Sequence, residues 1–311
     1  MDKLISNLID PEIFSTTSYK IKRILILGNT GFIGSHIEKK LRQFFPDKEI
    51  IGQSVRHIDL TEEESIKKLE KVLSPETAVV MCAAIKKQLG DNLSTFQKNI
   101  KIVINVCQAL QHSTVARFIY FSSAAVYGED VQNTTLTEET PVAPISYYGI
   151  AKYISECLLL KVFQELGKEK IVILRPAVVY GPDEPGKFYG PSGFVKSVLC
   201  QEPITLWGDG NEYREFIFID DVVNIVINLI FHNYSGIINV ASGRSYTFQE
   251  ILDIIERFLS LKLNINSRLR TKPRVDHRFN NALLKRLCPR VSFTSLEEGI
   301  HHVIEREKFL V

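Results

Sequence analysis

The stretch IKRILILGNTGFIGSHIEKKL, residues 21–41, passes from an apolar strand-like run through a glycine turn into a helical pattern. Glycines at positions 28, 31 and 34 permit a tight bend, a close approach of the backbone to a pyrophosphate, and close packing of helix on strand. The start of the helix offers unpaired amides and a favourable dipole to phosphates. The stretch therefore predicts a dinucleotide-binding turn, with a turn that serves only the fold as the alternative.

The same order of apolar run and helical pattern recurs along the chain. The further runs that predict strands are EIIGQSV (49–55), AVVMCAA (78–84), ARFIYFSS (116–123), KIVILRPAVVYGP (170–182) and GIINVASG (236–243). The pairs Thr61/Glu64 and Thr247/Glu250 have the spacing of a capping box and predict helix starts. Strands that alternate with helices predict an α/β fold with a doubly wound parallel sheet, the Rossmann arrangement.

Two irregular stretches interrupt this pattern: GPDEPGKFYGPSGF (181–194) and the basic NSRLRTKPRVDHRFNN (266–281). They predict a smaller, interleaved α+β domain that binds the substrate in a cleft against the first domain. The expected division is an N-terminal extension at 1–20, a dinucleotide-binding domain at 21–180 and 217–243, and a substrate-binding domain at 181–216 and 244–311.

Composition excludes several other classes of protein. The formal charge of +2 over 311 residues gives no support for binding nucleic acid or an anionic membrane. The five cysteines are scattered, without a CxxC pair, which favours reduced cytosolic thiols over a disulfide framework or a zinc site. The start of the chain, MDKLISNLIDPEIF, predicts neither a signal peptide nor a membrane span. We therefore expect a cytoplasmic protein without a metal site.

The stretch SYYGIAK, residues 146–152, places two tyrosines shortly before a lysine. Tyr148 and Lys152 are four residues apart, so on a helix they share a face, whereas Tyr147 has Ala151 at that offset. A nearby ammonium favours the phenolate and lowers the pKa of a tyrosine toward the range useful for proton transfer. The alternative is an ordinary pair on a solvated helix face.

The segment GQSVRHIDL (52–60), which follows the second predicted strand, bears on the cofactor. It has no acid at the strand end, where NAD sites usually bind the ribose hydroxyls, but it has Ser54 and Arg56. An arginine there accommodates a 2′-phosphate, so NADP (NADPH) is favoured over NAD. Alternatively, Arg56 is a simple surface residue. Asp59 and Leu60 fall where an adenine can be bracketed.

With the glycine turn, FSSAAVYG (121–128), SYYGIAK and RPAVVYGP (175–182) in this order, the chain resembles the extended short-chain dehydrogenase/reductase family. More narrowly, it is similar to the nucleotide-sugar epimerase/dehydratase group, over roughly residues 21–303. The resemblance implies that Tyr148 is the general acid/base and that Lys152 lowers its pKa and holds the nicotinamide ribose. It implies that Ser123, rather than Ser122, bonds to the reacting substrate oxygen.

The resemblance extends to binding residues. It implies cofactor contacts at Gly28, Thr30, Gly31, Phe32, Ile33, Gly34, Ser54, Arg56, Asp59, Leu60, Ala83, Ala84, Asn99, Tyr148, Lys152 and Pro176. It implies substrate contacts at Lys86, Ser123, Ala124, Phe194, Trp207, Arg214 and Arg274, with Arg214 on the nucleotide diphosphate. Asp220 and Asp221 are expected to cap and brace a helix. Satisfied core polarity is the alternative for Asn99, and a buried hydroxyl at a strand end is the alternative for Ser123.

Two departures from the group limit the activity. Ala124 and Ala125 stand where 4,6-dehydratases carry an acidic pair, which argues against elimination of water. Val178 stands where many sugar epimerases carry an asparagine, which leaves the sugar open and admits a small ketone or aldehyde as another substrate. The leading hypothesis is reduction of a 4-keto (deoxy)sugar nucleotide by NADPH. The alternatives are an NAD-dependent nucleotide-sugar 4-epimerase and, in a different class, a non-catalytic cofactor-sensing or assembly protein.

The resemblance also implies a homodimer formed by two helices. One has its apolar stripe at Phe96, Ile100, Val103, Cys107 and Leu110, and the other carries Tyr148 and presents Ile150, Ile154, Leu158 and Val162. Burial of both stripes within the monomer is the alternative.

Overall fold

The computed structural model describes residues 9, 14, 20–128, 135–167, 170–187, 189–270 and 274–309. Within them, a six-stranded sheet is formed by β1 (Arg23–Leu27), β2 (Glu49–Gln53), β3 (Thr77–Met81), β4 (Arg117–Phe121), β5 (Ile171–Pro176) and β9 (Gly236–Val240). The strand order is β2-β1-β3-β4-β5-β9, and every neighbouring pair is parallel. The predicted α/β fold with a parallel sheet is confirmed.

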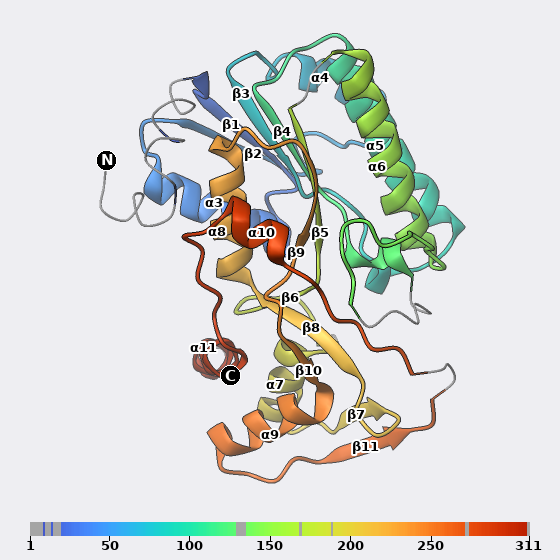
Figure 1. Cartoon of the computed structure of the whole chain (residues 1–311), viewed down its shortest axis with the longest axis vertical. Helices are drawn as coiled ribbons and strands as arrows, with labels where there is room; N and C mark the ends of the chain where they lie inside the picture. Colours follow the sequence, from blue (N-terminus) through green and yellow to red (C-terminus); the bar gives the residue numbers. More distant parts are fainter. Residues whose placement is uncertain are drawn as a thin grey trace.

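Helices cover both faces of this sheet (Figure 1). On one face lie α3 (Phe32–Phe44) and α8 (Ile219–Phe231), and on the other α4 (Glu64–Glu70), α5 (Leu93–Gln111) and α6 (Tyr147–Glu165). Successive strand residues point to opposite faces. In β1, Ile24 and Ile26 join the core beneath α3 and α8, whereas Leu25 and Leu27 join the core beneath α5 and α6. Burial on both sides explains why these strands are continuous apolar runs.

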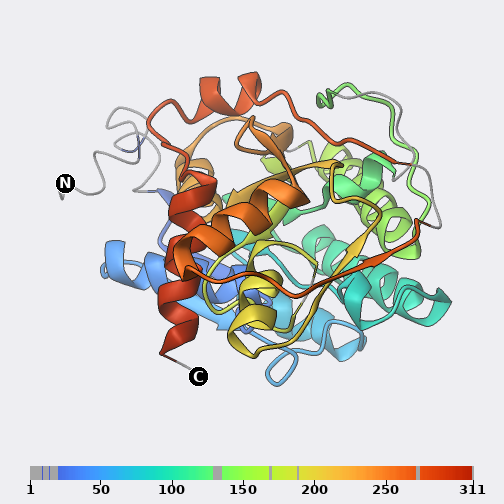
Figure 2. The same cartoon turned by 90° about the horizontal axis from the view of Figure 1, so that it is seen from below.

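The smaller part of the molecule occupies the lower half of Figure 1 and is seen end-on in Figure 2. Among the described residues its strands are β6 (Val178–Tyr180), β8 (Tyr213–Phe218) and β10 (Ser245–Thr247), in the order β10-β8-β6, and the pair β7 (Ile204–Trp207) and β11 (Ile265–Arg268). Its helices α7 (Pro191–Leu199), α9 (Phe248–Leu259) and α11 (Leu296–Lys308) contact one another.

Two elements depart from the expected domain boundaries. β6 falls in the range predicted for the dinucleotide-binding domain but pairs with β8 in the second sheet. α10 (Ala282–Leu287) falls in the substrate-binding range but contacts β9 of the first sheet. The chain crosses between the two parts several times, so the division into two domains stays a proposal.

Only residues 9, 14 and 20 of the predicted extension 1–20 lie among the described residues. Ile9 is fully buried in the core that α3 and α8 cover. The Phe14 ring lies 6.0 Å from that of Phe45 and 5.1 Å from that of Phe231, between centroids. These two positions therefore belong to the packed protein.

Only one of the two predicted capping boxes forms. Thr247 caps α9 by accepting from the Glu250 amide, and the Glu250 carboxylate accepts from the Thr247 amide. Thr61 instead donates its hydroxyl and its amide to Asp59 Oδ1, at 2.7 and 2.9 Å, and α4 begins only at Glu64. The Thr61/Glu64 prediction was wrong because the nearer carboxylate of Asp59 satisfies the threonine first.

Three observations bear on the classes excluded by composition. No helix in the described part of the chain is long and apolar enough to cross a membrane. A search of those same residues finds no cluster of three or more histidine, cysteine or acidic side chains able to hold a metal ion. All five cysteines lie in the described ranges as free thiols.

Candidate functional site

The glycine turn lies where the strand order reverses, between β1 and β3, at the carboxyl end of β1. In open parallel sheets, ligands bind in the crevice at this position. Gly28 has a φ of +89°, and a Cβ there would lie 2.8 Å from the Ala83 nitrogen. A Cβ on Gly34 would lie 2.3 Å from the Gly28 carbonyl oxygen. Both positions therefore require glycine, one for the turn and one for the packing of α3 against β1.

The N-terminus of α3 is suited to bind a phosphate group. Its N-cap residue is Gly31, no described side chain caps it, and its first turn holds no acid. Thr30 and Gly31 are exposed, Ile33 is half-buried, and Phe32 is buried beneath the turn. Free amides at a helix N-terminus bind anions. A coenzyme pyrophosphate thus fits the turn, with the Ala83 backbone on the opposite side.

The residues after β2 form the next part of the groove. Ser54 is buried, with its Oγ 3.3 Å from His57 Nδ1, and Arg56 is exposed, with no ion pair among the described residues. Asp59 is engaged with Thr61, and Leu60 is held by Asn105, whose Nδ2 donates to the Leu60 carbonyl at 2.8 Å. These contacts within the segment and with Asn105 hold its backbone in place. The exposed Arg56 side chain is free to contact a ligand.

Sequence inspection missed a carboxylate that reaches the end of β2. Glu38, on α3, accepts from Asn29 Nδ2 at 2.7 Å and is paired with Arg42 at 2.6 Å. Its Oε2 would lie 2.6 Å from a Cβ placed on Gly52. The absence of an acid from GQSVRHIDL therefore did not mean the absence of an acid near β2. The only sequence signal was a small residue, Gly52, opposite an acid nearly two turns into α3.

Ser123, Tyr148 and Lys152 lie together at the carboxyl edge of the sheet. Ser123 N-caps the 3₁₀ helix η3 (Ala124–Tyr127), where its Oγ accepts from the Ala125 amide at 3.1 Å, and its hydroxyl lies close enough to Tyr148 to lower the pKa of that tyrosine. Lys152 Nζ donates to the Phe121 carbonyl and lies 5.8 Å from the centre of the Tyr148 ring. The constellation has the parts needed to move a proton at a substrate oxygen.

Burial shifts the pKa values of both members of the pair. It raises the pKa of Tyr148 to about 12, and the neighbouring Ser123 hydroxyl acts in the opposite direction. Burial also lowers the pKa of Lys152 to about 8. Lys152 Nζ lies nearer to the Tyr120 ring, at 4.8 Å from its centre, than to the Tyr148 ring, at 5.8 Å. A lowering of the Tyr148 pKa by Lys152 stays a prediction.

The loop after β3 brings Ala83, Ala84 and Lys86 to the same edge. Asn99 holds this loop, since its Oδ1 accepts from the Ile85 amide at 2.8 Å and its Nδ2 donates to the Ile85 carbonyl at 3.0 Å. Its direct role is thus to shape the loop, as the alternative of satisfied core polarity expects.

Lys86 faces both parts of the molecule. Its Nζ lies 5.8 Å from the centre of the Phe32 ring, and its charge interacts with Glu184, in the loop between β6 and α7. Burial lowers the pKa of Lys86 and raises that of Glu184, while each group opposes the shift of the other. Sequence inspection missed Glu184, which appeared only as one acid in a Gly- and Pro-rich loop.

The residues predicted to lie near the substrate are found at the end of β5 and in the smaller part of the molecule. Pro176 ends β5, buried, and Val178 is 42% exposed on β6. Arg214 is paired with Glu212 at 3.1 Å, and Arg274 is paired with Asp276 through two hydrogen bonds of 3.0 Å. Trp207 is 41% exposed at the end of β7.

Phe194 does not lie where the sequence predicted. It is 4% exposed and packs among Tyr189, Phe248 and other aromatic residues, so it belongs to the core and is not free to contact a substrate. Asp221 accepts from the Thr294 amide and hydroxyl at 2.9 Å, and it joins α8 to the segment before α11 as a bracing residue.

A hollow of about 620 Å³ lies beside Arg274. Its lining residues are Gly208, Asp209, Ser267, Arg268, Leu269, Arg270 and Arg274. Arg268 lies 5.7 Å from the centre of a Trp207 ring, and Arg270 is bonded to Glu212, which also binds Arg214. The concentration of guanidinium groups suits an anionic ligand.

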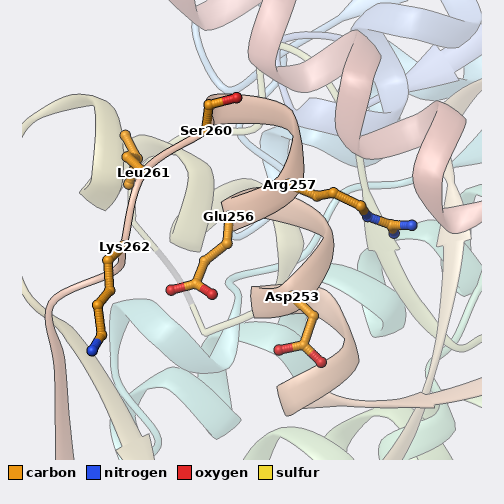
Figure 3. A pocket seen from close by; sticks show the side chains of 6 residues that line it. All are labelled: Asp253, Glu256, Arg257, Ser260, Leu261 and Lys262. Carbon is orange, nitrogen blue, oxygen red and sulfur yellow. The ribbon is translucent and has the colours of Figure 1, made fainter.

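Figure 3 shows a second hollow, at the end of α9. The carboxylates of Asp253 and Glu256 and the amine of Lys262 line it, and the Arg257 side chain extends away. Glu256 Oε1 accepts a hydrogen bond from the Leu263 amide at 2.8 Å. None of the predicted site residues lines this hollow.

Comparison with known proteins agrees with the glycine turn and the Ser123, Tyr148 and Lys152 constellation. Residues 24–241 match the NAD dependent epimerase/dehydratase family. The chain belongs to this family. Its members are enzymes that use nicotinamide coenzymes and act on nucleotide sugars, and the predicted resemblance is confirmed.

Individual members of the family are distant relatives. A putative UDP-glucose 4-epimerase of Methanocaldococcus jannaschii is 28% identical over 77% of this chain and 83% of its own length. The structure of a UDP-glucose 4-epimerase with UDP-glucose from Thermotoga maritima aligns with a TM-score of 0.79 at 26% identity, over 93% of this chain and all of that chain. A Thermus thermophilus UDP-glucose 4-epimerase in complex with NAD aligns with a TM-score of 0.81 at 24% identity, over 93% of this chain and all of the other, and supports the fold alone.

Proposed function

We propose that this protein is a nucleotide-sugar epimerase that inverts C4 of the sugar with a nicotinamide coenzyme. The observation that carries the proposal is the grouping of Ser123, Tyr148 and Lys152 at the sheet edge that also holds the glycine turn. The relatives named above are 4-epimerases, which favours this alternative over the 4-keto reduction expected first. Ala124 and Ala125 offer no acid for elimination of water.

The residues suggest a separate role for each side chain in the reaction. A bound coenzyme would supply an acceptor for the C4 hydrogen as hydride and would return it. The positive charge of its oxidised nicotinamide ring and the Lys152 ammonium would favour the phenolate of Tyr148 over the phenol. That phenolate would take the proton of the C4 hydroxyl as the hydride leaves, and Tyr148 would give the proton back when the carbonyl is reduced on its other face. Ser123 would hold the C4 oxygen, and Lys152 would hold the coenzyme ribose. Arg214 and Arg274 would meet the diphosphate.

Incubation of the purified protein with UDP-glucose, UDP-galactose, UDP-N-acetylglucosamine and UDP-N-acetylgalactosamine, without added coenzyme, tests the proposal. We expect chromatography to detect interconversion of one such pair with no net change in coenzyme absorbance. Oxidation of NADPH in proportion to consumption of a 4-keto sugar nucleotide would support the reductase instead. A failure of both reactions with all nucleotide sugars would refute the proposal.

We further propose NADP as the coenzyme that binds more tightly, because Ser54 and the exposed Arg56 follow β2. The 2′-phosphate lies at the end of the coenzyme remote from the nicotinamide, so epimerase chemistry accepts either form. We expect Arg56→Ala to weaken NADP binding at least tenfold, the effect of losing about 1.4 kcal/mol, and to leave NAD binding within twofold. Calorimetric titration of both coenzymes checks this, and equal losses for the two would contradict it.

Coenzyme affinity should depend on pH through Lys152. Because its pKa is about 8, its ammonium is present below pH 8 and is lost above it. A charged donor makes the stronger hydrogen bond to the ribose, so we expect the dissociation constant of the coenzyme to rise as pH increases through about 8. Lys152→Met should bind weakly at every pH and lack this midpoint. A wild-type affinity that is flat between pH 7 and 9 would disagree with this role.

The proposed partners are a nucleotide sugar and a second copy of the chain, in the cytoplasm. In α6 the predicted stripe residues Ile150, Ile154 and Leu158 are only half-buried, and Leu93 and Ile104 of α5 are 54% and 38% exposed. These apolar residues on neighbouring helices support a homodimer through α5 and α6.

A further inference from the structure

The inward face of α6 carries a buried ion pair behind the Tyr148 site. Glu156 is 1% exposed and Arg175, on β5, is 3% exposed. Arg175 Nε donates to Glu156 Oε1 at 3.0 Å and Nη2 donates to Oε2 at 2.7 Å. The Ser122 hydroxyl donates to the same carboxylate. Such a pair is costly to bury, and it is costlier still to break by removing one partner.

This pair joins every segment that carries a proposed catalytic group. Glu156 lies one helical turn beyond Lys152, Ser122 directly precedes Ser123, and Arg175 directly precedes Pro176. Arg175 Nη1 also donates to the Tyr127 hydroxyl at 3.1 Å, at the end of η3. The Tyr127 hydroxyl in turn donates to Asn239 Oδ1 at 2.7 Å, on β9. The network therefore connects α6 with the ends of β4, β5 and β9.

We propose that Glu156 is a positioning residue that holds Ser123 in place through Ser122 and keeps Lys152 charged, with Arg175 fixing its carboxylate. The inference rests on the proposed roles of Ser123 and Lys152. Because both carboxylate oxygens are engaged by Arg175 and Ser122, Glu156 does not draw the Lys152 amine out of the coenzyme groove. Lys152 Nζ is instead directed to the Phe121 carbonyl.

Glu156 is the acidic side chain that acts on Lys152. Cys82, which follows β3, Tyr120 on β4 and Tyr148 on α6 face Lys152 as neutral side chains near pH 7, because burial raises the pKa of each. Burial lowers the pKa of Lys152, and Cys82 and Glu156 both raise it against that effect. Beyond Glu156, Arg175 is the cation that would act on Lys152 if the carboxylate were neutral.

The test measures coenzyme binding to the full chain as a function of pH, which requires no sugar turnover. The midpoint of coenzyme affinity is the pH at which half of the pH-dependent loss of affinity has occurred. Glu156→Gln leaves Arg175 charged, so we expect this midpoint to move to lower pH by about 1 unit or more. The double variant Glu156→Gln/Arg175→Met removes both charges and should give a midpoint above that of Glu156→Gln but still below that of the wild type. Ser122→Ala keeps both charges and should leave the midpoint unmoved while lowering the rate of epimerisation about tenfold, the upper end of what one net hydrogen bond supplies.

A buried carboxylate elsewhere supplies the matched control. Glu215 on β8 is 1% exposed and accepts from the amides of Gly243 and Phe279. Glu215→Gln should lower the melting temperature and leave the midpoint of coenzyme affinity unchanged.

An unshifted midpoint in folded Glu156→Gln, or a wild-type rate in Ser122→Ala, overturns the proposal. If the single Glu156 variant does not fold, the double variant must show a midpoint below that of the wild type, and an equal midpoint overturns the proposal. Coenzyme binding with the expected shifts but without epimerisation would reject the proposed function and leave this inference standing.

Discussion

Tyr148→Phe is expected to lower the rate of epimerisation by about 10²–10⁴, the usual contribution of a positioned general acid/base. The substitution removes the hydroxyl that neighbours Ser123 and leaves the ring in its place. The backbone anchor is unaffected, because the Tyr148 amide donates to Asp91 Oδ1 at 2.9 Å. Turnover of the nucleotide sugar measured at saturating substrate, together with coenzyme affinity, checks this expectation.

The neighbouring tyrosine provides the control. Tyr147 is 42% exposed, and its ring lies 6.3 Å from that of Phe96, at a distance typical of aromatic packing. Tyr147→Phe should therefore keep the rate within twofold. A Tyr148→Phe protein with wild-type turnover would contradict the enzymatic role and favour a non-catalytic cofactor-sensing protein.

Gly34→Ala is expected to abolish tight coenzyme binding. The added Cβ would lie 2.3 Å from the Gly28 carbonyl oxygen, which is backbone and cannot rotate away. α3 must then move off β1, and the amides at its start leave the phosphate position. We expect at least a hundredfold loss of affinity, equivalent to about 2.8 kcal/mol, and an overpacking cost to folding of about 1–3 kcal/mol. Calorimetric titration and chemical denaturation measure the two effects.

Gly167→Ala separates loss of stability from loss of binding. Gly167 follows α6 with a φ of +61°, and nothing lies within 4 Å of an added Cβ. Alanine in this left-handed conformation costs about 1 kcal/mol of stability. Coenzyme affinity should remain that of the wild type. If Gly34→Ala behaves in the same way, the glycine turn serves the fold alone.

Much of the fold could be predicted because it depends on local patterns. Strands covered on both faces are apolar at most positions, and β1, β3, β4 and β5 can therefore be recognised in the sequence. The second sheet was harder, since β6 has three residues and follows β5 after a single residue, so the two form one apolar run. Helix starts depend on which acceptor a threonine finds, and Thr61 and Thr247 have the same spacing but different partners.

The candidate site was predictable only where it is contiguous in the chain. Tyr148 and Lys152 share one helix, and the glycines share one turn, so spacing sufficed. Three acids reach the site from other elements or from an inward helix face: Glu38, Glu184 and Glu156. The residues next to each of them in the sequence do not indicate that the acid lies near the site. On α6, Lys152, Ser155 and Glu156 are buried, whereas the apolar residues Ile150, Ile154 and Leu158 are only half-buried, so apolar character alone did not identify the inward face.

The interleaving of the smaller sheet limits how this protein can be recombined with its relatives. β6, β8 and β10 come from three separated stretches, and α8 returns to the larger sheet between them. A single crossover between Val178 and Thr247 would therefore split the smaller sheet between two parents. The strands from β1 to β5, by contrast, are consecutive from Arg23 to Pro176 and can be exchanged as one block. Chimeras that aim to change the sugar should transplant all three smaller-sheet strands together.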